Sequence, residues 1–79
     1  MKLPRDIDSQ QLIKSLNKFG YESTRQSGSH IRLSTQQNGQ HHITIPNHDP
    51  LKIGTLNAIL TEVAQHLGIP KQELIEKLF

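Results

Sequence analysis

The sequence predicts a small α+β domain with the element order α-β-β-β-α-α, in which a three-stranded antiparallel sheet is followed by a helix and an extra short C-terminal helix. Two patterns predict it. Apolar residues recur at helical spacing near both ends of the chain, whereas in the middle they alternate with polar residues, as in half-buried strands. The length of 79 residues leaves room for one domain, so residues 1–79 are expected to form a single unit.

The first helix is predicted over residues 9–19. Asp8 or Ser9 can cap its start, and Gly20 stands where a left-handed residue closes a helix. The residues at helical spacing, which are expected to face the core, are Leu12, Ile13, Leu16 and Phe19.

Three strands are predicted over residues 21–26, 29–35 and 40–46. Between the second and third, a three-residue loop that ends at Gly39 is expected to hold this glycine in a left-handed conformation. The resulting register pairs one apolar residue with another at two places, so that they share one face of the sheet. These pairs are Leu33 with Ile43 and Ile31 with Ile45.

The first hairpin is predicted to turn at Ser27-Gly28. This loop places Arg25 beside His30 on the polar face of the sheet. The same register directs Glu22 toward the apolar face, which makes strand 21–26 the hardest element to place from the sequence.

Two helices are predicted after the loop 47–52. The longer one covers 54–67 and stops near Gly68, and the shorter one covers 70–78 and begins with Pro70. Helices 9–19 and 54–67 are expected to cover the apolar face of the sheet, because three strands alone do not form a stable unit. The other face stays open and carries Arg25, His30, Arg32, His42 and Thr44.

The composition excludes several classes of protein. The absence of cysteine rules out disulfides, thiol chemistry and thiolate metal sites, and no apolar run is long enough for a membrane span. We therefore expect a cytoplasmic protein with no membrane contact. The net charge is only +2, but residues 9–52 carry five bases, two acids and four of the five histidines. This distribution favours a polyanion as partner, although a solvated basic surface has the same appearance.

His30 is the first candidate for chemistry, because a histidine titrates near neutral pH and Arg25 beside it can hold a phosphate. His48 lies two residues beyond the predicted neighbour of His30, and Lys52 flanks the start of a helix, where free amides suit a phosphate. From the residues alone, an ordinary surface position is the simpler interpretation of His30 and of His48, and an ordinary helix start explains Lys52 at least as well. His41 and His42 point to opposite faces and lack the spacing of a zinc site, so we expect neither a metal nor a cofactor.

Several stretches resemble the HicA (YcfA-like) family of mRNA interferase toxins. They cover about residues 4–68, in the order and spacing of the family, and leave residues 69–79 as an extension. The matching residues are Leu12-Ile13-Lys14, Phe19-Gly20-Tyr21, Arg25-Gln26-Ser27-Gly28-Ser29-His30, Ile45-Pro46-Asn47-His48, Gly54-Thr55-Leu56 and Ile59-Leu60. Ser27 and Asn57 depart from the family, which often has a basic residue at each place.

The resemblance implies a fold like that of a double-stranded-RNA-binding domain and a metal-independent endoribonuclease that acts as the toxin of a type II toxin–antitoxin module. The family's catalytic histidine falls on His30. The expected partners are mRNA and a HicB-type antitoxin that covers the active site. We expect Arg25, Ser29, Arg32, His48 and Lys52 to bind RNA.

Two alternatives stay open at this point: an RNA-binding module that does not cleave, and an interaction protein whose open face docks another chain. Residues 69–79 either pack on helix 54–67 or form a contact with a second copy or with the antitoxin.

Overall fold

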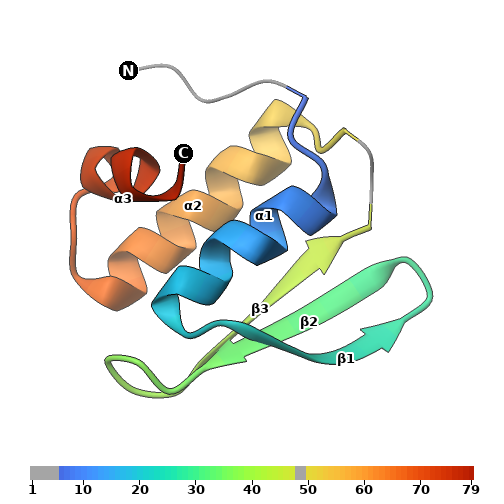
Figure 1. The fold of residues 1–79 in the computed structure, drawn as a ribbon, viewed down its shortest axis with the longest axis horizontal. Helices are drawn as coiled ribbons and strands as arrows, with labels where there is room; N and C mark the ends of the chain where they lie inside the picture. The colour runs from blue at the N-terminus through green and yellow to red at the C-terminus, as the bar shows by residue number, and fades with distance from the viewer. Residues whose placement is uncertain (1–5, 48–49) are drawn as a thin grey trace.

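The computed structural model describes residues 6–47 and 50–79 and shows an α+β fold with the predicted order of elements (Figure 1). The helices are α1 (Ser9–Leu16), α2 (Ile53–Leu67) and α3 (Lys71–Leu78), and the strands form one antiparallel sheet. Its strands, in the order β1-β2-β3, are β1 (Glu22–Ser27), β2 (His30–Thr35) and β3 (His41–Pro46). The fold class predicted from the sequence is confirmed.

The first helix begins with a capping box at Asp8. The Gln11 amide donates to the Asp8 carboxylate at 2.7 Å, and the Asp8 amide donates to the Gln11 side chain at 2.9 Å. The α-helix is shorter than predicted, because its last turn, η1 (Asn17–Phe19), tightens into a 3₁₀ helix. Gly20 closes it with φ of 80°, as expected, and a Cβ there would lie 2.9 Å from Thr35 Oγ1.

The second hairpin has the predicted register, which pairs Leu33 with Ile43 and Ile31 with Ile45. Asn38 and Gly39 both have positive φ, at 56° and 94°, so Gly39 is left-handed as expected. The apolar residues of β2 and β3 therefore share one face.

The predicted register of the first hairpin is wrong. Ser27 pairs with His30, so the two-residue loop is Gly28-Ser29, and Arg25 lies opposite Arg32 instead of His30. Gly28 has φ of 58° and takes the first loop position, where a two-residue hairpin turn of the II′ kind requires glycine.

A bulge in β1 places Glu22 on the opposite face of the sheet from the one that the sequence predicted. The register shifts between Ser23 and Arg25, which leaves Thr24 as the extra residue. Glu22 then pairs with Ser34 and is exposed on the open face, whereas the sequence predicted it on the apolar face. No carboxylate of β1 therefore has to be buried under the helices.

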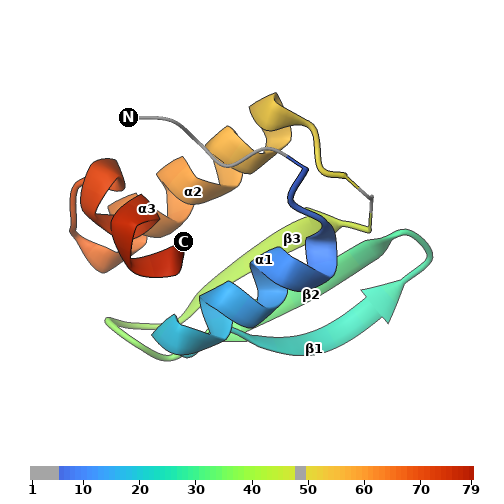
Figure 2. The same cartoon turned by 45° about the horizontal axis from the view of Figure 1, so that its top comes forward.

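The helices α1 and α2 lie on the same side of the sheet and leave its other side uncovered (Figures 1 and 2). The covered side holds the core, to which α3 adds Leu74 and Leu78, at 0% and 4% exposure. The extension thus packs into the same core as α2. The other fully buried large side chains are Leu12, Leu16, Tyr21, Leu33, Ile45, Leu56, Leu60 and Val63.

A histidine pair ties the end of α2 to the second hairpin. His66 stacks on His41 with ring centroids 4.3 Å apart, and its Nε2 lies 2.9 Å from the carbonyl oxygen of Gln37. The Asn38 side chain donates back to the His66 carbonyl at 2.7 Å. The buried Tyr21 hydroxyl contacts His41 Nδ1 at 2.7 Å, so His41 is half-buried and anchored rather than a solvated edge residue.

Candidate functional site

The uncovered face of the sheet is organised as three rows of side chains that run across the strands. Successive rows are two residues apart along β2, or about 7 Å. From the β1–β2 turn inward, we call them the histidine row, the arginine row and the serine row. They consist of Ser27–His30–Pro46, Arg25–Arg32–Thr44 and Glu22–Ser34–His42.

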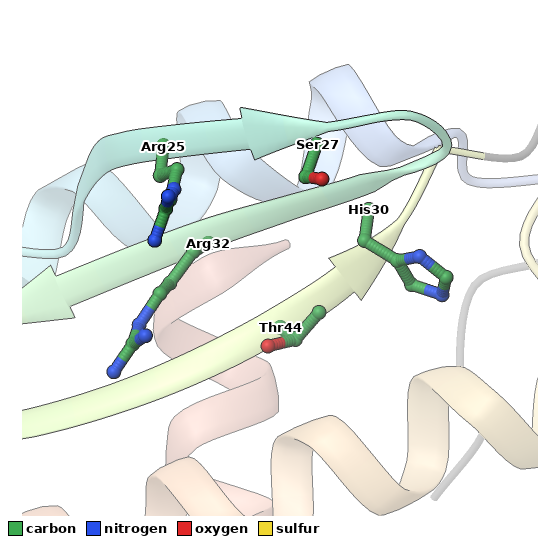
Figure 3. Close-up of a pocket in the computed structure, with 5 residues that line it drawn as sticks. All are labelled: Arg25, Ser27, His30, Arg32 and Thr44. Atoms are coloured by element: carbon green, nitrogen blue, oxygen red, sulfur yellow. The ribbon is translucent and has the colours of Figure 1, made fainter.

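The first two rows line an open pocket of about 360 Å³. In Figure 3 the two arginine side chains lie on one side of this pocket and the His30 ring lies on the other, with Thr44 between them. The lining residues are Arg25, Ser27, His30, Arg32 and Thr44. All five are exposed to solvent.

The arginine row is an electrostatic anomaly, because two like charges stand directly opposite each other on neighbouring strands. Such pairs destabilise a sheet. Within residues 6–47 and 50–79, the salt bridge that the structure shows joins Lys77 to Glu73, so neither Arg25 nor Arg32 is neutralised by a carboxylate. Two adjacent guanidinium groups without an acid are suited to hold an anion such as a phosphate.

The β1–β2 turn positions His30 at the rim of the pocket. Gly28 makes the tight turn, and His30 follows as the first residue of β2. The Asn47 amide donates to the Ser29 carbonyl at 2.6 Å, which fixes the backbone next to His30 from the β3 side. An exposed imidazole on a rigid strand end, one row from two arginines, can exchange a proton with a group bound at the arginines.

The other residues predicted for RNA binding lie around this pocket or apart from it. Ser29 is exposed in the turn beside His30 but does not line the pocket. Lys52 is exposed at the N-cap of α2 and does not line the pocket either. His48 lies outside the described residues. Arg25 and Arg32 are therefore the two predicted binding residues that the structure brings together with His30.

The described residues contain no group of three or more His, Asp or Glu side chains arranged to hold a metal ion. None of the helices in the described part of the chain is both long and apolar enough to cross a membrane.

Burial shifts the pKa values of Tyr21 and His41, the two hydrogen-bonded residues on the covered side of the sheet. It raises the pKa of Tyr21 from 10.0 to about 12, with a smaller contribution from the Glu62 carboxylate. It also lowers the pKa of His41 from 6.5, and the neighbouring His66 acts in the same direction. His41 is therefore held neutral and occupied by Tyr21, and it is not available to a ligand on the open face.

The fold and the pocket together define a class: a small α+β protein whose open sheet face gathers two arginines and an exposed histidine. The chain can also be assigned to a family. Residues 9–68 match the family model described as HicA toxin of bacterial toxin–antitoxin, and the chain belongs to this family. The resemblance read from the sequence motifs is thereby confirmed. No curated protein and no solved structure matches the chain.

Sequence reasoning missed the like-charged pair Arg25–Arg32 and the contact of Ser34 with His42. Ser34 and His42 are neighbours in the predicted register of β2 and β3, but their side-chain contact was not inferred from it. The arginine pair follows from the register of β1, which depends on whether Ser27 or Gly28 opens the turn. The usable signal was the glycine itself, because a two-residue loop of the II′ kind places glycine first.

Proposed function

We propose that this protein is a metal-independent endoribonuclease that cleaves mRNA, acts as the toxin of a type II toxin–antitoxin module, and uses His30 as its catalytic residue. The observation that carries the proposal is the pocket in which two arginines, without a carboxylate partner among the described residues, lie one row from His30. Membership of the HicA toxin family supports it independently.

In this mechanism the arginine row binds the phosphate at which the chain is cut. Arg25 and Arg32 donate hydrogen bonds to its non-bridging oxygens and stabilise the negative charge that grows there. His30 takes the proton of the neighbouring ribose 2′-OH, whose oxygen attacks the phosphorus. The bond from phosphorus to the 5′-oxygen breaks, and that oxygen takes a proton from water. The products are a 2′,3′-cyclic phosphate and a 5′-OH end.

A single positioned acid–base group is worth about 10² to 10⁴ in rate. Each phosphate contact made by Arg25 or Arg32 adds about 0.7 to the slope of log affinity against log salt for a single strand. Ser29 and Lys52 are proposed to contact the RNA backbone at the edges of the site, and His48, which lies outside the described residues, is also proposed to bind RNA. The family implies a HicB-type antitoxin as the protein partner, which we place over the same open face.

The test is inducible expression in a bacterial host of the wild type, of His30→Ala and of Gln26→Ala. The control residue Gln26 pairs with Ile31 and is exposed on the other side of the same strand pair. We expect growth arrest with loss of intact mRNA for the wild type and the control, and neither for His30→Ala.

Purified wild-type protein is then expected to cleave RNA with or without a chelator. Cleavage that stops with the chelator contradicts the metal-independent mechanism. Salt-sensitive binding that leaves the RNA intact identifies the protein as a binding module instead.

A further inference from the structure

The serine row is a second polar cluster on the open face, and the proposed cleavage chemistry does not use it. Ser34 Oγ lies 2.5 Å from His42 Nδ1, and the other ring nitrogen of His42 lies 3.2 Å from Gln40 Nε2. Both ring nitrogens are thus engaged, and the imidazole is held in one orientation although it is exposed to solvent. A fixed aromatic ring on an exposed sheet face is a surface on which a base can stack.

The hydrogen bonds also set the tautomer of this ring. The Gln40 amide nitrogen only donates, so His42 Nε2 is the acceptor and Nδ1 carries the hydrogen. Nδ1–H then donates to Ser34 Oγ, and the hydroxyl hydrogen of Ser34 is left for a group outside the protein. The row therefore presents a donor at Ser34, at the edge of the His42 ring.

The order of residues in the row excludes a serine nucleophile of the triad kind. In a triad the carboxylate contacts the histidine and holds it toward the serine. Here Ser34 stands on the central strand between Glu22 and His42, so the cross-strand neighbour of Glu22 is the serine and not the histidine. The row is arranged to bind a group, not to form a covalent intermediate.

Glu22 decides which part of a nucleic acid fits this row. Its carboxylate repels a phosphate but accepts hydrogen bonds from an exocyclic amino group, which adenine, cytosine and guanine carry and uracil lacks. The arginine row, about 7 Å away along β2, has the opposite preference. An extended strand laid along β2 can therefore place a phosphate on the arginines and the adjacent base on the serine row.

We propose that Glu22, Ser34 and His42 form a nucleobase site that prefers a base with an exocyclic amino group next to the cleaved phosphate. The proposal deepens the ribonuclease function and rests on it for the position of the RNA, but it is tested by binding alone. It makes the protein selective against uracil at one position beside the cut.

The experiment uses full-length protein with His30→Ala, so that RNA stays intact during the measurement. The probes are four labelled heptaribonucleotides that are uridine throughout except at the central position, which is A, C, G or U. Fluorescence anisotropy gives the four dissociation constants. We expect the A, C and G probes to bind at least about fivefold more tightly than the all-uridine probe.

Two further substitutions, each made in the His30→Ala protein, separate the contribution of the Glu22 carboxylate from that of the His42 ring. Glu22→Ala is expected to abolish the preference and at the same time to tighten binding of the all-uridine probe, because a negative charge is removed. His42→Ala is expected to weaken the A, C and G probes most, since stacking is lost. Gln26→Ala, on the other side of the same sheet edge, should leave all four constants unchanged.

Equal affinity for the four probes, or an equal loss for all of them in both variants, overturns the nucleobase site while leaving ribonuclease activity untouched. Failure of all four probes to bind also overturns it, and weaker antitoxin binding by the same variants then assigns the row to a protein contact. Base-selective binding by a wild-type protein that does not cleave RNA refutes the catalytic proposal and keeps the nucleobase site.

Discussion

The two faces of the sheet differ although they alternate along the same strands. On the covered face, Ile31, Leu33, Ile43 and Ile45 are at most 3% exposed. On the open face, Arg25, Arg32 and Thr44 are exposed, and α1 and α2 lie on the other side of the sheet (Figure 2). One face provides the stability of the fold, which leaves the other free to hold arrangements that cost stability, such as two arginines opposite each other.

The histidines show the same division. His41, at the covered edge, is bonded to Tyr21 and stacked on His66, and burial keeps it neutral. His30 and His42, on the open face, are exposed. The same residue type is therefore structural on one side of the sheet and a candidate for chemistry on the other.

The largest effect should come from comparing adjacent residues of β2. Leu33→Ala, on the covered face, is expected to lower the free energy of unfolding by about 2 to 5 kcal/mol, because it leaves a cavity in a closed core. Arg32→Ala, on the open face, should change it by no more than about 1 kcal/mol, because it leaves no cavity and removes only the like-charge pair with Arg25. Urea unfolding measures both, and similar losses would mean that the two faces do not divide stability and function.

The next effect concerns Tyr21, the single tyrosine of the chain. Tyr21→Phe removes the hydrogen bond to His41 and is expected to cost about 1 kcal/mol of stability. In the wild type, ultraviolet titration should show the phenol ionising near a pKa of about 12 in the folded protein. Because the unfolded pKa is 10.0, stability should fall as the pH rises through this interval. An ionisation near 10.0 in folded protein would contradict the burial of this hydroxyl.

A smaller effect of the opposite sign is expected at the arginine row. Arg25→Thr removes the like-charge pair with Arg32 and should raise the free energy of unfolding by about 0.2 to 1 kcal/mol at low salt. The same change should reduce the salt dependence of RNA binding by about 0.7 in log–log slope. A destabilised variant would show that Arg25 contributes to the fold, not only to the site.

The smallest effect is a dependence of stability on pH. The folded pKa of His41 lies below 6.5, so the unfolded state binds more protons, and stability is full above that pH and decreases below it. The titratable groups that act on His41 are Tyr21, His42, Glu62 and His66. Melting temperatures from about pH 7 to about pH 5 should fall less steeply in His41→Gln. Parallel curves for the two proteins would remove His41 from this dependence.

The second hairpin was predictable because its register is fixed by burial. Shifting β2 against β3 by one residue would expose Ile43 and Ile45, so the apolar pattern permits one answer. Strand β1 has no such constraint, because all six of its residues are exposed. Its pairing depends on the φ of Gly28 and on a bulge at Thr24, neither of which leaves a hydrophobic signature in the sequence.

In the candidate site, too, the residues of β2 were predictable and the positions that depend on β1 were not. His30 and Arg32 lie on β2, whose face is set by its buried neighbours, and their place on the open face is confirmed. The partner of Arg25 and the place of Glu22 in the serine row depend on β1, so the neighbour predicted for Arg25 was wrong. The stacking of His66 on His41 depends on where α2 ends against the second hairpin, which no local pattern encodes.

The three rows lie entirely between Glu22 and Pro46, whereas α2, which completes the cover that α1 begins, comes later in the chain. During synthesis, the ribosome therefore completes the residues of the candidate site before the second of the two helices that cover their sheet. A nascent chain that stops before Ile53 carries every one of these residues on a sheet that has only α1 to cover it. When bacterial cells that survive induced expression are selected, we expect inactivating mutations on the buried side of α2 to be as frequent as mutations in the site itself. The buried residues concerned are Leu56, Leu60 and Val63.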